Sequence, residues 1–246
     1  SKLAGIEKQQ ILPTVCVFSY VKSQIDFDII YEHYQRQAYA YKKFLIVSPE
    51  GVSINIEDSN VLMVQLKGEL GKLLGVDEND WVATFVKEDF YDKHYVEDLI
   101  LATRYTTSDV IGKGSYYDFR ESGLEYKDNS NSYTSVPELI ARSSMIKASL
   151  FSEMSILEYI RKIYTHRFTG DCFSIDEFSY CMNGQGYNKA SEITEITETI
   201  DQGYHLSQLS ELAENKRASI EGDKEIKIIS SHTLFEMIPT PKNTLV

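Results

Sequence analysis

The sequence predicts an α/β fold with a mostly parallel central sheet, helices on its faces and an extension at the carboxyl end. Short apolar runs rich in β-branched and aromatic residues recur along the chain, and segments with helical periodicity separate them. Strands that alternate with helices form right-handed βαβ units, which place the strands parallel in one sheet. The 246 residues, 42% of them hydrophobic, suffice for one large domain with an appendage.

The elements follow from local patterns. A polar lead-in over residues 1–12 ends at Pro13, and the polar run 116–133 fits an exposed loop or a hairpin. Residues 68–74 fit either a short helix or a loop. We predict strands over residues 15–19, 44–47, 61–64, 81–86, 139–147 and 173–175, a further strand that ends near residue 113, and helices over residues 25–39, 95–105 and 155–164.

We predict a domain over residues 1–185 and an extension over residues 186–246, in which residues 192–200 repeat Glu-Ile-Thr units as an acidic amphipathic stretch. The extension contains a predicted helix over residues 204–217 and a short strand over residues 226–230. We expect it to pack on, or to link to, another domain. The missing initiator Met and the final segment PTPKNTLV predict a piece of a longer protein.

Charge and cysteine content exclude several classes of protein. A formal net charge of -12 argues against nonspecific nucleic-acid binding, which requires a basic surface. The cysteines Cys16, Cys172 and Cys181 are an odd number without close pairing, so a disulfide framework is not expected. No segment has the roughly 18 apolar residues of a membrane helix. We therefore expect a cytoplasmic location.

Acidic residues follow the apolar run 81–86. The run ends at Lys87, Glu88 and Asp89. Carboxylates at the carboxyl end of a parallel strand project to the edge where open α/β sheets bind ligands. Mg²⁺ and Mn²⁺ prefer oxygen ligands and keep several waters, so one or two carboxylates can hold such an ion.

The stretch from residue 81 to residue 113 resembles bacterial GT-A glycosyltransferases of the family 2 type. The family has a strand, an Asp-rich motif, a Tyr-rich turn and a helix that ends in a segment similar to A-x-x-Y-x-x-A-D-V-V-G-K. Matching this segment are Ala102, Tyr105, Asp109, Val110, Ile111, Gly112 and Lys113. The resemblance covers residues 12–184 and implies a GT-A, Rossmann-like fold that binds a nucleotide sugar.

The acidic motif departs from the family pattern Phe-Asp-x-Asp-Asp-x-Tyr-Gly. The first Asp of the pattern is Val86 here, the second is Glu88, and Asp89 is retained. The resemblance implies that Glu88 and Asp89 hold a divalent cation, Mn²⁺ or Mg²⁺, which neutralises the leaving diphosphate. Lys87 is open to two interpretations: it binds phosphate, or it pairs with Glu88 and replaces the metal.

The first βαβ unit also resembles the family. There the strand ends in a Ser-Tyr turn that lines the nucleotide pocket, which assigns Ser19 and Tyr20 to nucleotide binding. Glu50 stands near the usual nucleotide-contacting acid. The segment ARSSMIKASLF resembles the strand before the base helix and places Arg142 at the border of the acceptor site.

The family places a Glu-Asp pair at the start of a late helix, where the Asp deprotonates the acceptor. In FSEMSILEYIRKIY this pair aligns with Glu158 and Tyr159. A Tyr with its ordinary pKa near 10 is a poor base at neutral pH. Glu158 or Glu153 are the alternatives. His166 and Arg167 are candidates for binding phosphate or acceptor, or are structural.

The resemblance implies an inverting glycosyltransferase that moves a sugar from a nucleotide donor, such as a UDP sugar, to a saccharide acceptor in surface polysaccharide or glycan biosynthesis. The alternative is a catalytically inactive glycosyltransferase-like domain that serves binding or assembly in a larger protein, favoured by Val86 and Tyr159 at the two chemical positions. A third interpretation, an unrelated Rossmann-type nucleotide binder, lacks the expected Gly-x-Gly-x-x-Gly turn, because residues 18–23 contain no glycine.

Overall fold

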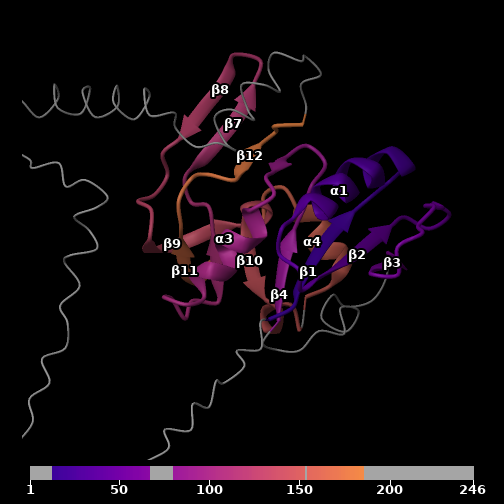
Figure 1. Cartoon of the computed structure of the whole chain (residues 1–246), viewed down its shortest axis with the longest axis horizontal. Coiled ribbons are helices and arrows are strands. Elements are labelled where there is room, and N and C mark those ends of the chain that lie inside the picture. The colour runs from indigo at the N-terminus through magenta and orange to yellow at the C-terminus, as the bar shows by residue number, and fades with distance from the viewer. Residues whose placement is uncertain (1–12, 67–79, 153, 186–246) are drawn as a thin grey trace, which may run out of the picture. The chain divides into compact units, whose positions relative to one another are not determined.

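A computed structural model describes residues 13–66, 80–152 and 154–185. Its centre is an eight-stranded sheet with the strand order β3-β2-β1-β4-β10-β6-β11-β9 (Figure 1). The strands are β1 (Val15–Tyr20), β2 (Lys42–Ser48), β3 (Val61–Gln65), β4 (Trp81–Thr84), β6 (Val110–Gly112), β9 (Thr134–Ile140), β10 (Ser144–Lys147) and β11 (Arg167–Ser174). This architecture confirms the predicted α/β class.

The strand directions divide the sheet into two parts. β1 pairs in parallel with β2 on one side and with β4 on the other, and β3 continues the parallel part beyond β2. β10 runs antiparallel to both β4 and β6, and β9 runs antiparallel to β11. The first part therefore consists of parallel βαβ units, and the second part is mixed.

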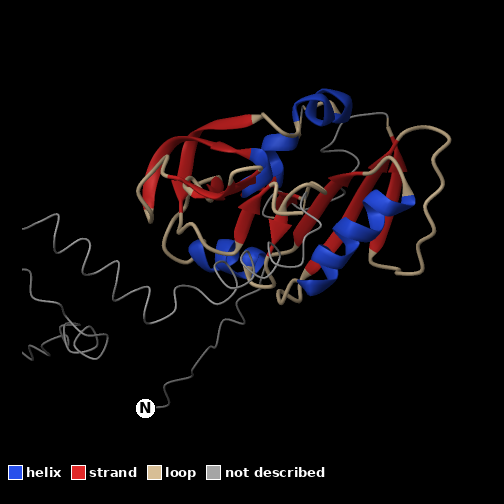
Figure 2. Cartoon of the chain, turned by 90° about the horizontal axis from the view of Figure 1, so that it is seen from above, coloured by secondary structure: helices blue, strands red, loops and turns tan. Residues whose placement is uncertain are grey.

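Both faces of the sheet are covered by helices (Figure 2). Alternate residues of β1 point to opposite faces, as the pleat requires: Val17 packs in the same cluster as α1 (Gln24–Arg36) and α3 (Tyr95–Ala102). Phe18 packs in the cluster that contains α4 (Ile156–Lys162). Helix α1 begins at Ser23, whose side chain accepts a hydrogen bond from the backbone N–H of Asp26.

A smaller sheet of four strands has the order β5-β12-β7-β8. Its strands are β5 (Phe90–Tyr91), β7 (Tyr116–Arg120), β8 (Gly123–Lys127) and β12 (Tyr180–Met182). β7 and β8 form an antiparallel hairpin, so the hairpin interpretation of residues 116–133 is confirmed. The first strand of the hairpin is buried rather than exposed, because β12 pairs with it in parallel.

Several element boundaries differ from the prediction. The single strand predicted over residues 139–147 is wrong: a 3-10 turn, η1 (Ala141–Ser143), separates β9 from β10. The hydroxyl of Ser144 donates to the Ile140 carbonyl at 2.7 Å and stabilises this turn. Helix α1 ends at Arg36, and the Gln37 side chain bonds the carbonyls of His33 and Asp92. A second 3-10 helix, η2 (Ala148–Phe151), follows β10.

Residues 68–74 and the extension over residues 186–246 lie outside the described residues, so those predictions are untested. Among the helices in the described ranges, none is both long and apolar enough to cross a membrane.

Candidate functional site

The chain adds its strands on opposite sides of β1, although β1, β2 and β4 all run parallel. The chain passes from β1 through α1 to β2 on one side, and later returns to β4 on the other side of β1. In open α/β sheets, ligands bind outside the carboxyl ends of the strands at such a switch point. Here those ends are residues 19–22, at the end of β1, and residues 85–89, after β4. We call them together the strand-end site.

An ion pair joins the two halves of the strand-end site. The Lys87 ammonium lies 2.7 Å from Asp26 Oδ1, and Asp26 Oδ2 accepts the backbone N–H of Lys22 at 3.1 Å. Burial acts to raise the pKa of Asp26, but the hydrogen bonds from Lys87 and from Lys22 hold this pKa below its ordinary value. The Lys87 side chain remains 41% exposed, so its charge is fixed in place and still open to a ligand.

The residues predicted to contact the nucleotide have different surroundings. Tyr20 is half-buried, and the Lys22 ammonium lies 5.7 Å from the centre of its ring. Glu50 is exposed in the turn after β2. Ser19 is fully buried, and its hydroxyl donates to the Phe85 carbonyl at 2.8 Å, which ties β1 to the end of β4. The Ser19 hydroxyl therefore joins the two segments of the strand-end site and is not exposed to a ligand.

Asp89 is buried, and protein groups bind both of its carboxylate oxygens. Its carboxylate is fully buried and receives a bidentate ion pair from Arg142, with Nε at 2.7 Å from Oδ2. It also accepts the Tyr180 hydroxyl at 2.7 Å and the Asn183 backbone N–H at 2.8 Å. Burial opposes the charge on Arg142, but Tyr180 and Asp89 hold the pKa of Arg142 above its ordinary value.

The geometry does not fit the predicted metal site at Glu88 and Asp89. Both oxygens of Asp89 are already bound by Arg142, and the carboxylate of Glu88 accepts the Tyr164 hydroxyl at 2.8 Å. A divalent cation requires oxygen ligands that face it together. Across residues 13–66, 80–152 and 154–185, no three His, Cys, Asp or Glu side chains are grouped to hold one. Arg142, predicted to border the acceptor, is instead the buried partner of Asp89.

The segment after β12 fixes the same turn from the other side. The backbone N–H of Gln185 donates to the Glu88 carbonyl at 2.9 Å, next to the bond between Asn183 and Asp89. The Gln185 side chain lies 2.7 Å from His33 Nε2. Residues 183–185, which we call the strap, therefore connect the turn after β4 to helix α1.

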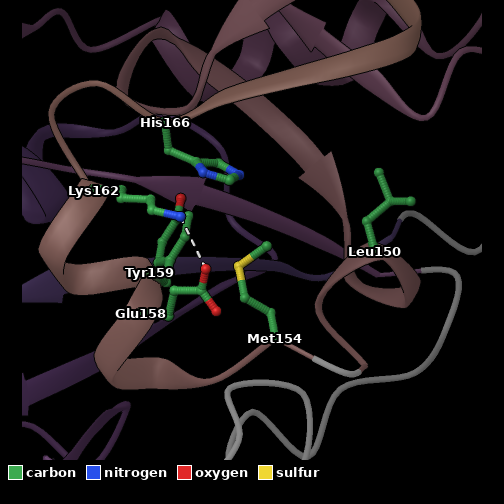
Figure 3. A pocket seen from close by; sticks show the side chains of 6 residues that line it. All are labelled: Leu150, Met154, Glu158, Tyr159, Lys162 and His166. Atoms are coloured by element: carbon green, nitrogen blue, oxygen red, sulfur yellow. Dashed lines mark hydrogen bonds and ion pairs between the residues drawn. The ribbon is translucent and has the colours of Figure 1, made fainter.

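Helix α4 borders a cavity of about 280 Å³, which we call the α4 pocket (Figure 3). It is lined by Leu150, Met154, Glu158, Tyr159, Lys162 and His166. The structure thus brings both residues predicted for the base position, Glu158 and Tyr159, to one cavity. Its volume lies just below the usual range for ligand pockets, roughly 300–1,000 Å³, and suits one small ligand such as a single sugar ring.

Glu158 and Tyr159 differ in their availability. Glu158 is exposed, and its carboxylate pairs with the Lys162 ammonium at 2.9 Å, which lowers the pKa of Glu158. Tyr159 is 1% exposed, and its hydroxyl lies 2.6 Å from Thr84 Oγ1. Burial raises the pKa of Tyr159, so its phenol stays protonated. A base role for Tyr159 stays a prediction that this geometry does not support; Glu153 lies outside the described residues.

His166, a minor candidate in the sequence analysis, lines the α4 pocket. Its ring is half-buried and contacts the rings of Tyr159 and Phe168 edge-on, with centroids 5.7 and 4.7 Å apart. Burial and the nearby Lys162 lower the pKa of His166. A lone His after a helix has no distinctive pattern in sequence; the cavity alone reveals it.

Two hydrogen bonds place α4 and the residues after it next to β4. Tyr159, in the wall of the α4 pocket, bonds Thr84 at the end of β4. Tyr164, which follows α4, donates to Glu88 in the strand-end site. The wall of the pocket therefore lies beside the strand that leads into the strand-end site.

No protein-family model and no curated protein matches the chain. Among solved structures, the chain is similar to residues 1–349 of S. aureus TarS, with 12% identity and a TM-score of 0.44 over 75% of this chain and 63% of that one. The structures of TarS 1–349 in complex with UDP-GlcNAc and with UDP match at 13% and 11% identity, each with a TM-score of 0.43 and over 68% of this chain. Those matches cover 58% and 60% of the TarS chains. The chain thus spans less than two thirds of the length of these solved chains.

Proposed function

We propose that the chain binds a nucleotide sugar at the strand-end site and transfers the sugar to a saccharide acceptor in the α4 pocket. The observation that carries this proposal is the proximity of the two regions: Tyr159 in the wall of the α4 pocket bonds Thr84, the last residue of β4, and Tyr164 after α4 bonds Glu88. Transfer requires that donor and acceptor be held next to each other, because positioning supplies much of the rate enhancement. The class of pathway, surface polysaccharide or glycan biosynthesis, follows from the family resemblance.

The charges of the strand-end site suit a diphosphate. Lys22 is exposed beside Tyr20, and Lys87 is held in place by Asp26 with its side chain still partly exposed. Departure of a nucleoside diphosphate builds negative charge, which fixed positive groups stabilise. In this chain the two lysines carry that role, since Glu88 and Asp89 are bound to protein partners.

The second candidate function is a domain that binds nucleotide sugars without catalysis. The burial of Asp89 and Tyr159 favours it, because one predicted metal ligand and one predicted base residue are both buried and bound by other side chains. Both candidates share the donor site and differ only in turnover.

Calorimetric titration with uridine diphosphate tests the donor site. We expect Lys87→Ala to weaken binding about tenfold, because a hydrogen bond to a charged group is worth roughly 1.5–3 kcal/mol. Lys127→Ala is the matched control: Lys127 also forms a 2.7 Å ion pair, with Glu125, but in the β7–β8 hairpin. Lys127→Ala should leave the affinity for uridine diphosphate unchanged. Addition of Mn²⁺ should change the affinity of the parent protein by less than about twofold, because Glu88 and Asp89 are bound to protein partners.

Binding that requires Mn²⁺ would reinstate the metal interpretation, and equal affinities for the Lys87 and Lys127 variants would remove the donor site. Release of uridine diphosphate from sugar donors, measured with saccharide acceptors, then separates the two candidates. Binding without any turnover favours the noncatalytic domain.

A further inference from the structure

We propose that His166 is the general base of the α4 pocket and takes the proton from the attacking acceptor hydroxyl. This inference rests on the proposed function and assigns its proton-transfer step to a residue outside the Glu158–Tyr159 pair.

The position of His166 suits this role. Its half-buried ring lines the cavity opposite Leu150, and Figure 3 shows the imidazole extending from its backbone towards the space between α4 and Leu150. Within the described ranges, no hydrogen bond to a protein group occupies the imidazole nitrogens. A ring nitrogen is therefore available to a ligand hydroxyl in the cavity.

The ring is held in one orientation by its surroundings. The backbone N–H of His166 donates to the Lys162 carbonyl at 2.6 Å, and the His166 carbonyl accepts the N–H of Ala141 at 2.9 Å. Tyr159 and Phe168 contact the ring edge-on from two elements, α4 and β11. Groups fixed in this way lose little freedom when a ligand binds, which favours efficient proton transfer.

His166 and Glu158 are both unprotonated at neutral pH, as a base requires, but the Glu158 carboxylate already pairs with the Lys162 ammonium at 2.9 Å. Burial lowers the pKa of the His166 imidazole and Lys162 lowers it further, while Glu158 acts in the opposite direction. The imidazole is therefore neutral at pH 7 and retains a lone pair. The hydrogen bond from Lys162 lowers the pKa of Glu158, whereas burial raises that of Tyr159; both shifts make proton abstraction less favourable.

Transfer of the sugar is a displacement at its anomeric carbon. The acceptor oxygen forms a bond to the anomeric carbon while its proton passes to an imidazole nitrogen. The bond between the anomeric carbon and the diphosphate oxygen breaks, and its electron pair leaves with the nucleoside diphosphate. The imidazolium is stabilised by the Glu158 carboxylate on the facing helix, and it returns the proton to water after the product leaves.

The pH dependence of kcat/KM, measured with saturating donor, tests the assignment. We expect the parent protein to lose activity on acidification through a pKa below 6.5, since protonated His166 cannot accept a proton. His166→Gln should lower the rate by about 10²–10⁴-fold and remove this acidic limb. Glu158→Gln should retain the limb, because Glu158 titrates at lower pH.

Uridine diphosphate affinity and the urea unfolding midpoint of His166→Gln serve as controls and should equal those of the parent. A His166→Gln variant as active as the parent, or a parent that binds the nucleotide but turns over no donor, overturns the base assignment. Loss of activity in Glu158→Gln with the limb unchanged in His166→Gln overturns it in favour of Glu158. A parent that binds no nucleotide overturns the proposed function itself.

Discussion

The turn after β4 and the start of α4 are both acidic segments, but their carboxylates differ in burial and in hydrogen-bond partners. In the turn, Asp89 is fully buried and bound by Arg142, Tyr180 and Asn183. In α4, Glu158 is exposed and borders a cavity together with His166.

Because of this difference, we expect Asp89 to act on the stability of the fold and the pocket residues to act on the reaction. A buried carboxylate with all of its oxygens bound contributes to the fold and has no capacity left for a ligand. A group at the border of a cavity contributes little to stability and remains available to substrate. Changes at Asp89 should therefore act mainly on unfolding, and changes in the α4 pocket mainly on turnover.

The largest expected effect is at Asp89. Asp89→Asn leaves the Arg142 charge buried without a counterion, so the free energy of unfolding should fall by about 3–5 kcal/mol. Urea denaturation measures this loss. Glu158→Gln, which breaks an exposed pair with Lys162, should change it by less than about 0.5 kcal/mol.

A double variant sharpens the result at Asp89. Asp89→Leu combined with Arg142→Met removes both charges and should recover much of the stability, because apolar replacements of a buried pair are often neutral. Equal losses in Asp89→Asn and Glu158→Gln would show that the turn is not sealed in solution.

The next effect concerns two histidines, His33 in α1 beside the strap and His166 after α4. His33 is buried beside the strap, and burial lowers its pKa to about 4, with Arg36 acting in the same direction. Because the unfolded chain binds this proton with a pKa near 6.5, the contribution of His33 to stability is complete above that pH. It is lost as the pH falls, by about 3 kcal/mol at pH 4.

Unfolding free energies measured between pH 7 and pH 4 test this effect by the difference between the parent and His33→Gln. The difference isolates His33 from the carboxylates that titrate in the same range. His166→Gln, at the open pocket, should show a smaller pH-dependent difference, because its ring is only half-buried. Equal differences for the two histidines would contradict the comparison.

The smallest effect is at Tyr159, on the border of the two regions. Tyr159→Phe removes the hydroxyl that bonds Thr84 and should cost about 1 kcal/mol of unfolding free energy. Turnover should fall by less than about tenfold, since one neutral hydrogen bond between the two regions is lost but the buried, protonated phenol is not the base. A loss of activity that exceeds the loss of stability would restore Tyr159 to the chemistry.

The sequence predicted the parallel part of the sheet well because its signals are local. The strands around Val17, Ile46 and Val82 are continuous apolar runs, and α1 has a Ser cap with helical periodicity. The second part was harder. β9 and β10 are consecutive apolar segments with a 3-10 turn at Ala141–Ser143, which no glycine or proline marks. β5 and β12 are too short for a periodic pattern.

The location of the candidate site could be predicted from the sequence, but the role of each residue in it could not. The acidic turn follows a recognisable strand, so Lys87, Glu88 and Asp89 could be placed at its carboxyl end. The partners of Asp89 are distant in sequence: Arg142 by 53 residues, Tyr180 by 91 and Asn183 by 94. A single sequence does not reveal such pairings. They decide whether a carboxylate is bound by protein groups or available to a ligand.

The strap makes the turn that carries Lys87 depend on residues far along the chain. Asn183 bonds the Asp89 carboxylate and Gln185 bonds the Glu88 carbonyl, while the Gln185 side chain also bonds His33 of α1. Lys87 itself pairs with Asp26 of the same helix. Helix α1 therefore fixes the lysine twice, once directly through its ammonium group and once through the backbone that carries it.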